Sequence, residues 1–341
     1  MTCLFFYLSG EHQTLPVAEC IAILEGEKIK YSVIMKAAQI IVLDTEEKAA
    51  RIVAEKAAYT HMVCKLIGVY DSRMTDFKSE DLSGLKLSGG ETFSVRVYVI
   101  GEDSGEHNKL ELERIIGGKV IAASKGGLKV QLQSPCTEFI GIVSGGKLFF
   151  DFRLSKIDRR AIDKRSGKYR PYFYPGVINP RIARAMVNLA RVRCGDVFLE
   201  PFIGTGGIGI EAGVQGCRVI GLEIKRKMIY ASKSNLNYYK VRYDLVIGDA
   251  RSIPFTKADG GATDPPYGVS TSTLGDETWR LIKETLKNIQ NIIKPGGYFT
   301  IAFPAKINLE RLVEGLKLKV VDVFELYVHK SLTRKIVVLR R

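Results

Sequence analysis

The chain has 341 residues, 46% of them hydrophobic, which is enough for two or three domains with buried cores and excludes a largely disordered protein. The formal net charge is +14, but residues 1–150 carry 17 basic and 19 acidic side chains, whereas residues 151–341 carry 34 and 18. A basic surface confined to one half indicates a polyanionic partner. Nucleic acid is favoured over an anionic membrane, because the sequence has no lipidation signal or basic amphipathic anchor.

The cysteines and the N-terminus exclude further classes. The six cysteines are scattered and none forms a C-x-x-C pair, which argues against zinc fingers and redox dithiols, and we expect no metal site. Free, buried thiols in a reducing cytoplasm are the expectation. The apolar residues 1–10 are too short to span a membrane and lack the features of a signal peptide, so they predict a buried strand.

Residues 1–150 predict two small mixed units. In the first 60 residues, short apolar and β-branched runs predict strands over 3–8, 31–35 and 39–43, with helices over 16–24 and 46–60. The remainder predicts one helix over 110–116 and strands over 62–70, 92–99, 119–121, 128–132 and 139–143.

The composition changes after residue 150. Residues 151–170 hold eight basic and three acidic side chains, which predicts either a linker or a basic strap that faces RNA. A helix follows over 180–191, with Pro180 near its start. Strands are then predicted over 197–199, 218–222, 245–247, 261–263, 298–303, 319–328 and 335–340, and helices over 207–215, 226–239, 276–293 and 309–316. This alternation predicts a doubly wound α/β domain with a mostly parallel sheet.

A glycine-containing loop follows the first strand of that domain. Residues 200–206 read Glu-Pro-Phe-Ile-Gly-Thr-Gly and open the next helix, so a ligand can approach the backbone and the amides at the start of the helix closely. The loop alone is a weak signal. Gly204, Gly206 and Gly209 also match the G-x-G-x-x-G spacing of loops that bind nicotinamide cofactors, and a plain tight turn is a third alternative.

Acidic residues at the next two strand ends are suited to an adenosine. Glu223 ends the second strand, 17 residues after Gly206, where a carboxylate can accept hydrogen bonds from both ribose hydroxyls. Asp249 follows the third strand, and its carboxylate can accept from the adenine amino group. The carboxyl ends of parallel strands share one edge, so we expect these residues to converge on one crevice.

The segment Asp264-Pro265-Pro266-Tyr267 at the end of the fourth strand favours methyl transfer over hydride transfer. An aryl amine is a weak nucleophile because its lone pair is delocalised into the ring. Asp264 and the Pro265 carbonyl can each accept an N–H, which turns the lone pair toward a methyl donor, and Tyr267 can stack on the base. The alternative for this segment is a Pro-Pro turn without function.

Through these residues, the segment 171–341 resembles the Rossmann-type amino-methyltransferases. Tyr174-Pro175-Gly176, Asn179-Pro180 and Ala183-Arg184 resemble the N-terminal cofactor motif of that family. The layout of the rest looks like a ferredoxin-like domain over 1–60, a THUMP RNA-binding domain over 61–150 and a basic linker over 151–170. The combination is similar to the archaeal tRNA guanosine-10 N2-methyltransferases.

The resemblance implies that S-adenosylmethionine is the cofactor, that tRNA is the partner and that the protein is cytoplasmic, with no obligate protein partner evident. It implies N2-methylation, once or twice, of a guanosine. The implied amine-recognition residues are Asp264, Pro265 and Tyr267, and the implied cofactor-binding residues are Glu200, Gly204, Thr205, Gly206, Glu223, Ile224, Asp249 and Ala250.

Two features depart from the family pattern or qualify it. Glu200 stands where an aspartate is expected, and its longer side chain can still reach the methionine end of the cofactor. Residues 1–150 are net acidic by two, so a THUMP domain there needs a local basic patch, for which the candidates are Lys119, Lys125, Lys129 and Lys147. In the second half, an acid-free run supplies a candidate phosphate track, with a solvated helix face as the alternative: Lys225, Arg226, Lys227, Lys233, Lys240 and Arg242.

Several alternatives remain open at the level of the sequence. The substrate can be another guanosine of tRNA or rRNA, or an adenine N6, because the same motif serves both amines. Glutamine methylation is less favoured, since those sites usually resemble Asn-Pro-Pro-Tyr. A non-catalytic RNA-binding protein with a degenerate methyltransferase fold is the rival from another class, and the intact acidic set Glu223, Asp249 and Asp264 argues against it.

Overall fold

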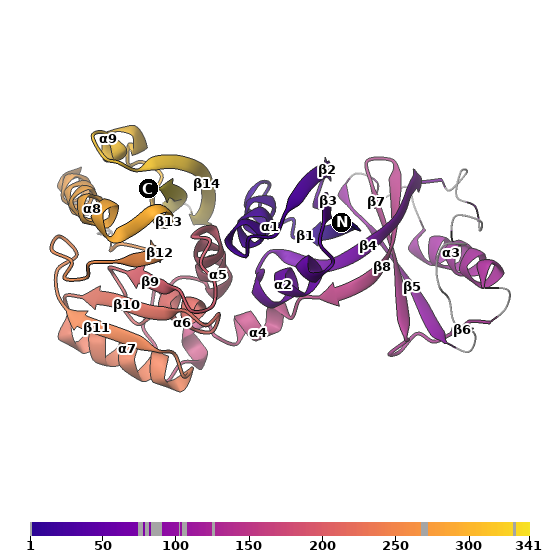
Figure 1. Cartoon of the computed structure of the whole chain (residues 1–341), viewed down its shortest axis with the longest axis horizontal. Coiled ribbons are helices and arrows are strands. Elements are labelled where there is room, and N and C mark those ends of the chain that lie inside the picture. The colour runs from indigo at the N-terminus through magenta and orange to yellow at the C-terminus, as the bar shows by residue number, and fades with distance from the viewer. Residues whose placement is uncertain are drawn as a thin grey trace. The chain divides into compact units, whose positions relative to one another are not determined.

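The computed structural model describes residues 2–73, 78, 82, 91–101, 103, 108–124, 127–266, 272–329 and 332–341, with the backbone alone at 272–276 and 329. The chain divides into two compact units (Figure 1). The first contains Met1–Val17, Ile29–Glu55 and Thr60–Ile157, and the second contains Ala18–Lys28, Lys56–Tyr59 and Asp158–Arg341.

One sheet of eight strands, ordered β2-β3-β1-β4-β8-β7-β5-β6, organises the described part of the first unit. The strands are β1 Thr2–Leu8, β2 Tyr31–Ala37, β3 Ile40–Thr45, β4 Thr60–Asp71, β5 Thr92–Val99, β6 Lys129–Val130, β7 Thr137–Ser144 and β8 Lys147–Lys156. Strand β4 pairs antiparallel with β1 on one side and with β8 on the other. The sheet is therefore continuous across residue 60, where the sequence predicted a boundary between two domains.

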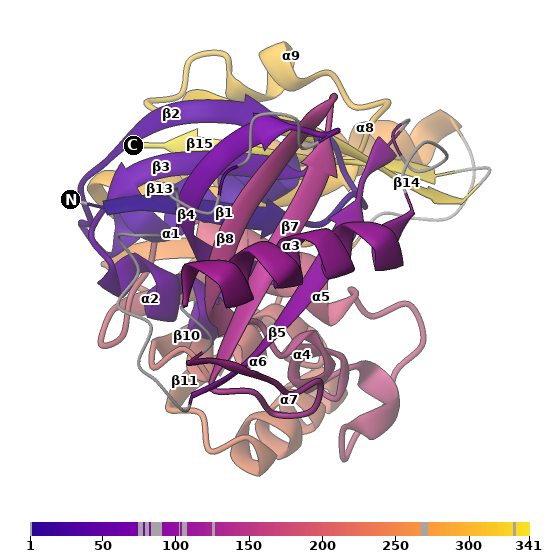
Figure 2. The ribbon, with the colours of Figure 1, turned by 90° about the vertical axis from the view of Figure 1, so that its right-hand side faces the viewer.

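The helices of this unit differ from their predicted extents. Helix α2, Lys48–Lys56, is shorter than expected because Thr60 already begins β4. Helix α3, Lys109–Ala123, is longer, and it packs Leu112, Ile116 and Val120 against β5 and β7 (Figure 2). The strand predicted over 119–121 was wrong, because the buried stripe with a spacing of four residues continues past the glycine pair into that segment.

The predicted linker over 151–170 begins inside a strand. Strand β8 pairs with β4 and β7 and runs to Lys156. Helix α4, Arg159–Asp163, and a single 3-10 turn, Gly167–Tyr169, follow it. Residues 151–156 are therefore sheet, and the later part of the segment is ordered structure.

Buried ion pairs hold the second part of that segment in place. Arg165 Nε and Nη2 donate to the two carboxylate oxygens of Glu211 at 2.7 and 2.9 Å. Arg184 Nε donates to Glu211 Oε2 at 2.7 Å, and Glu211 is fully buried. A buried carboxylate needs compensating charge, and Arg165 and Arg184 supply it to Glu211. These ion pairs therefore hold the segment around Arg165 against the helices that carry Arg184 and Glu211.

The second unit is the predicted doubly wound α/β domain. Its sheet order is β11-β10-β9-β12-β13-β15-β14, with β9 to β13 parallel and β15 antiparallel to β13. The strand order reverses between β9 and β12, which opens a crevice at their carboxyl ends. The strands are β9 Val197–Glu200, β10 Arg218–Glu223, β11 Tyr243–Ile247, β12 Ala258–Thr263, β13 Ile293–Pro304, β14 Lys319–His329 and β15 Leu332–Arg340.

The helices of this unit follow the sequence signals closely. Asn179 caps α5 by accepting from the Arg181 N–H, and Pro180 occupies the first turn. The inner face of α8 buries Ile282, Leu286 and Ile289 against the sheet. The helices are α1 Leu15–Gly26, α5 Pro180–Leu189, α6 Gly207–Gly213, α7 Arg226–Tyr238, α8 Ser272–Ile292 and α9 Leu309–Val313.

A piece of the N-terminal region completes the second unit, which the sequence did not predict. Glu19 of α1 is fully buried and accepts from the N–H groups of Ala58 and Tyr59 at 2.9 and 2.8 Å. It also accepts from Asn188 Nδ2 of α5 at 2.8 Å. Burial raises the pKa of Glu19, although these hydrogen bonds act in the opposite direction.

The six cysteines all lie in described segments and are free. Cys20, Cys64 and Cys217 are buried as expected, but Cys136 and Cys194 are exposed. Among the described residues, no helix is long and apolar enough to cross a membrane.

Candidate active site

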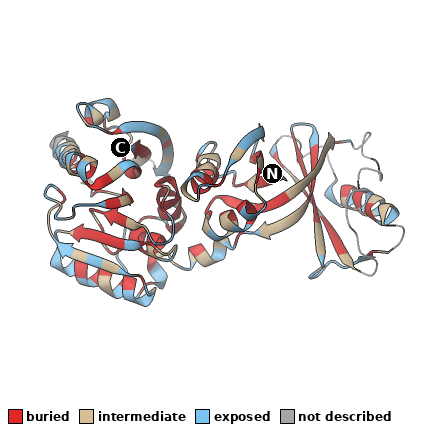
Figure 3. Ribbon diagram, in the orientation of Figure 1, coloured by how far each residue is buried: buried red, intermediate tan, exposed pale blue. Residues whose placement is uncertain are grey.

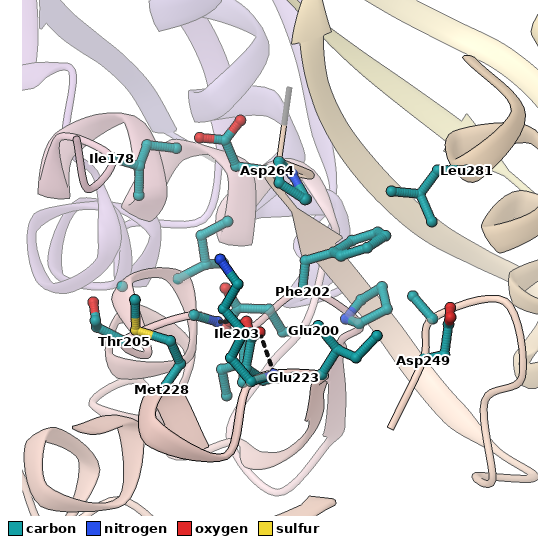
Figure 4. A pocket seen from close by; sticks show the side chains of 18 of the residues that line it. Ile178, Glu200, Phe202, Ile203, Thr205, Glu223, Met228, Asp249, Asp264 and Leu281 are labelled. Atoms are coloured by element: carbon teal, nitrogen blue, oxygen red, sulfur yellow. Dashed lines mark hydrogen bonds between the residues drawn. The ribbon is translucent and has the colours of Figure 1, made fainter. Parts of the chain in front are cut away.

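Four neighbouring strands of the second unit end at one cleft. In the order β11-β10-β9-β12, their carboxyl ends bring Asp249, Glu223, Glu200 and Asp264 to the same edge of the sheet (Figure 4). The cleft has a volume of about 820 Å³, within the range of small-molecule sites. Its wall includes Glu200, Gly204, Thr205, Glu223, Ile224, Asp249, Ala250 and Asp264, so the separate sequence motifs meet in space.

The loop after β9 has the backbone that its glycines predict. Gly204 and Gly206 have φ angles of +51° and +84°, in the left-handed region that favours glycine. Gly206 donates to the Ile203 carbonyl at 2.7 Å and immediately precedes α6. A Cβ at Gly206 would lie 2.9 Å from Ser232 Oγ, which leaves no room for a side chain there. Gly206 shapes the loop from behind, while Gly204 and Thr205 line the cleft.

Glu223 connects this loop to β10. Its Oε2 accepts from the Gly204 N–H at 3.2 Å, and its Oε1 accepts from the Lys225 N–H at 2.9 Å. A carboxylate has about four acceptor positions, so each oxygen keeps capacity for a further donor from the cleft. The arrangement suits a ligand with two adjacent hydroxyl groups.

Glu200 is more enclosed than the sequence suggested. It is only 2% exposed, and a Cβ at Gly209 of α6 would lie 3.1 Å from its Oε2. Burial raises the pKa of Glu200 well above its usual range, whereas the Gly209 N–H and the Arg170 charge act to lower it. Glu200 forms part of the cleft wall, with its carboxyl group turned against α6.

Asp249 already has a partner at this site. Arg251 Nε donates to Oδ1 and Oδ2 of Asp249 at 3.0 Å each, and Arg251 Nη2 donates to Oδ2 at 2.5 Å. These hydrogen bonds lower the pKa of Asp249. The sequence reasoning missed Arg251, which also lines the cleft. A ligand amino group that binds Asp249 has to share the carboxylate with this guanidinium or displace it.

Asp264 follows β12 and meets an arginine from the C-terminal hairpin. Arg334 Nη2 of β15 lies 3.4 Å from Asp264 Oδ2, and the two side chains are 11% and 16% exposed. Strand β15 reaches the site because it pairs antiparallel with β13, the neighbour of β12. No pattern in the sequence pointed to Arg334, which lies 70 residues beyond Asp264 and belongs to no motif.

The structure describes the two prolines of the Asp-Pro-Pro-Tyr segment but not its tyrosine. Pro265 is buried, and Pro266 is exposed and lines the cleft. Tyr267, predicted to stack on a base, lies outside the described residues. The described residues contain no group of three or more His, Cys, Asp and Glu side chains able to hold a metal ion.

A strap, residues 172–178, closes one side of the cleft. Tyr174, Pro175 and Gly176, which resemble part of a cofactor motif, line the cleft together with Val177 and Ile178. Asn235 of α7 fixes the strap. It accepts from the Tyr172 N–H at 2.9 Å and donates from Nδ2 to the carbonyls of Tyr172 and Thr205, each at 3.0 Å. Asn235 is fully buried and joins the strap to the glycine loop, a role that no sequence motif indicated.

Comparisons with known proteins identify the family. Residues 167–336 match the family model described as RMKL-like, methyltransferase domain. The tRNA (guanine(10)-N2)-dimethyltransferase of Methanothermobacter thermautotrophicus is 34% identical over 336 residues, covering 98% of both chains. The chain belongs to the tRNA (guanine(10)-N2)-dimethyltransferase family. The member from Methanocaldococcus jannaschii is 31% identical over 366 residues, covering 98% of this chain and 99% of its own.

Solved structures support the fold of the family. TrmN from Thermus thermophilus aligns with a TM-score of 0.54 at 19% identity, covering 99% of both chains. The putative methyltransferase SMU.472, solved in complex with SAH, aligns with the same score at 13% identity, covering 99% of this chain and 97% of its own. At these identities the likeness supports the α/β methyltransferase architecture, which the sequence had predicted for residues 171–341.

Proposed function

We propose that this member of the family transfers methyl groups from S-adenosylmethionine to the N2 amino group of a guanosine in tRNA, at position 10, once or twice. The observation that carries the proposal is that Asp264 lines the same cleft as Glu223 and Gly204. The names of the two archaeal relatives agree with this substrate and with dimethylation.

The residues of the cleft fit the cofactor. Glu223 keeps acceptor capacity on both oxygens after its two backbone bonds, which matches the two ribose hydroxyls of an adenosine. A Cβ at Gly204 would meet nothing within 4 Å, so the backbone there faces open space. Asp249 and Ala250 border the cleft where the adenine would lie, and Glu200, Thr205 and Ile224 complete its wall.

Bound S-adenosylmethionine supplies a methyl group on a positively charged sulfur. The residues of the chain make the amine reactive. The Asp264 carboxylate accepts one N–H of the amino group and the Pro265 carbonyl accepts the other, which draws the nitrogen lone pair out of the ring and orients it. Asp264 takes up the proton that leaves the nitrogen. Arg334 pairs with the same carboxylate, and Tyr267 stacks on the base.

The first half of the chain is assigned to RNA recognition. We propose that residues 61–150 act as a THUMP domain that grips the tRNA, with Lys119, Lys129 and Lys147 among the contacts; Lys125, the fourth candidate, lies outside the described residues. The function needs no membrane, and we expect the protein in the cytoplasm, where tRNA and the cofactor meet.

The test is methylation of an unmodified tRNA transcript followed by nucleoside mass mapping. We expect N2-methylguanosine and N2,N2-dimethylguanosine at position 10, and none in a transcript with adenosine at that position. Mapping tRNA from cells that lack the gene provides the second arm. Methylation at another guanosine would change the assigned position, and methylation of adenine N6 would contradict the assigned base.

A further inference from the structure

Exposed aromatic rings in the described residues gather in one part of the second unit. Six aromatic side chains there are strongly exposed, and one of them, Tyr327 of β14, lies apart. The other five belong to residues 169–174 and to helix α7. They are Tyr169, Phe173, Tyr174, Tyr230 and Tyr238, with exposed fractions from 45% to 62%. Exposed apolar surface that gathers in this way marks an interaction site.

These two segments lie side by side. Asn235 of α7 exchanges two hydrogen bonds with the backbone of Tyr172, at 2.9 and 3.0 Å. Tyr174 of one segment and Lys225, which caps the start of the other, both line the cleft. Residues 169–174 together with residues 225–242, which include α7, therefore form a continuous surface, hereafter the aromatic–basic surface, that reaches the candidate active site.

The charge of this surface is uncompensated. Six cations in and around α7 form no salt bridge with any described residue: Lys225, Arg226, Lys227, Lys233, Lys240 and Arg242. Elsewhere in the unit, arginines such as Arg181, Arg218 and Arg251 have carboxylate partners. The flanking acids are engaged as well, because Glu223 binds backbone N–H groups and Asp244 pairs with Arg218. Six unpaired positive charges beside five exposed rings call for an anionic partner from outside.

The pattern distinguishes a nucleic-acid partner from a simple solvated face. Helix α7 buries Ile229, Ala231 and Leu236 and points Tyr230 and Tyr238 outward, and its outer face is exposed in Figure 3. Solvated faces gain nothing from exposed tyrosines. Rings that alternate with cations suit a single strand, because bases stack on the rings while phosphates contact the lysines and arginines.

We propose that the aromatic–basic surface binds the unpaired nucleotides that flank the target base and leads that strand into the cleft. The proposal rests on the proposed function, since it takes RNA as the substrate. It adds a second RNA-contacting surface, within the second unit, to the one expected in residues 61–150.

Two variants of the full chain test the surface. The first, Tyr230→Ser/Tyr238→Ser, removes stacking, and the second, Lys227→Gln/Lys233→Gln, removes charge. The matched controls in the same unit are Tyr327→Ser and Lys317→Gln/Lys319→Gln, at exposed positions outside the surface. The measurements are affinity for tRNA and for a single-stranded oligouridine over a salt series, together with calorimetric binding of S-adenosylhomocysteine.

We expect the tyrosine variant to bind both RNAs about tenfold more weakly at every salt concentration, with an unchanged salt slope. The lysine variant should lose about 0.7 from the slope of log affinity against log salt for each phosphate contact removed. Both controls should match the unsubstituted chain, and all variants should bind S-adenosylhomocysteine normally.

The failures are distinguishable. If the unsubstituted chain methylates tRNA while both test variants bind RNA as their controls do, the aromatic–basic surface is wrong and the proposed function stands. If the unsubstituted chain neither binds nor methylates tRNA, both proposals are overturned. Equal weakening in the controls would assign the effect to general surface change and would also overturn the inference.

Discussion

At the scale of single residues, the proposed function assigns the groups that line the cleft to two ligands, the amine and the cofactor. Asp264 lies at the end of β12 with Arg334 beside it, whereas Glu223 is tied to the glycine loop through Gly204. Because these two carboxylates contact different elements, substitutions at them should change different measured quantities.

Asp264→Ala should lower the methylation rate by about 10²–10³-fold, because one acceptor of the amino group is removed from the transition state. Affinity for S-adenosylhomocysteine should stay near normal, since Glu223 and the glycine loop are intact. Single-turnover rates and calorimetry on the same preparation would measure both quantities. A variant that methylates tRNA at the unsubstituted rate would show that Asp264 does not serve the reaction.

Glu223→Ala should weaken S-adenosylhomocysteine binding by about 1–3 kcal/mol, because the charged acceptor for the ribose hydroxyls is lost. Glu223→Gln keeps one carbonyl oxygen and should lose less. Glu310→Ala, at the exposed start of α9, is the control for a lost surface carboxylate. Unchanged affinity in Glu223→Ala, measured by calorimetry, would remove Glu223 from the cofactor site.

At the scale of elements, β8 holds a buried carboxyl group that the proposed reaction does not use. Asp151 is fully buried, and neither of its carboxyl oxygens has a hydrogen-bond partner among the described residues. Burial raises the pKa of Asp151 well above its usual range. The folded chain therefore holds this proton more tightly than the unfolded chain does.

The sign of the pH dependence follows from that difference. The contribution of Asp151 to stability is fully present below about pH 4, the usual pKa of an aspartate, and is lost as the pH rises toward the pKa in the folded chain. The loss is about 1.4 kcal/mol for each pH unit within that window. Asp151→Asn should remove this slope, so its melting temperature should fall less between pH 5 and pH 8. Scanning calorimetry checks this, with Asp44→Asn of β3 as the control, and parallel declines in both variants would contradict the prediction.

At the scale of the whole molecule, the question is whether the second unit folds, binds the cofactor and methylates RNA without the first half of the chain. The loops proposed to bind the cofactor lie within residues 171–341, so the sequence favoured an isolated fragment of that range. The structure changes the choice, because Arg165 pairs with buried Glu211, and Glu19 of α1 contacts Asn188. A fragment that starts at residue 171 lacks both Arg165 and Glu19.

We expect a 158–341 fragment to be more stable than a 171–341 fragment by about 1–3 kcal/mol, because it keeps the charged hydrogen bonds to Glu211. Denaturant unfolding measures the difference. The longer fragment should bind S-adenosylhomocysteine, and it should bind RNA weakly, with an affinity that falls steeply as salt rises. It should not methylate full-length tRNA efficiently, because the first half no longer positions the RNA. Site-selective methylation at the rate of the full chain would refute this division of labour.

The sequence by itself determined the α/β architecture of the second unit and the residues that meet at its cleft. Strand and helix periods are local properties, and the carboxyl ends of parallel strands must share an edge, so Glu223, Asp249 and Asp264 could be brought together on paper. It failed where a local pattern was ambiguous, as in the glycine pair of α3 or the basic segment 151–170, whose first six residues belong to β8.

Only the tertiary structure decided which side chains neutralise, orient or compete with those residues. Arg334 lies on the antiparallel strand β15 and pairs with Asp264. Asn235 of α7 joins the strap to the glycine loop by hydrogen bonds. Arg251 donates hydrogen bonds to the Asp249 carboxylate. Each of these contacts depends on how separate elements pack or on how a loop folds. Packing and loop conformation, unlike helix and strand periodicity, produce no regular pattern in the sequence. The same reason explains why Glu19 could not be assigned to the catalytic unit until α1 was seen packed against α5.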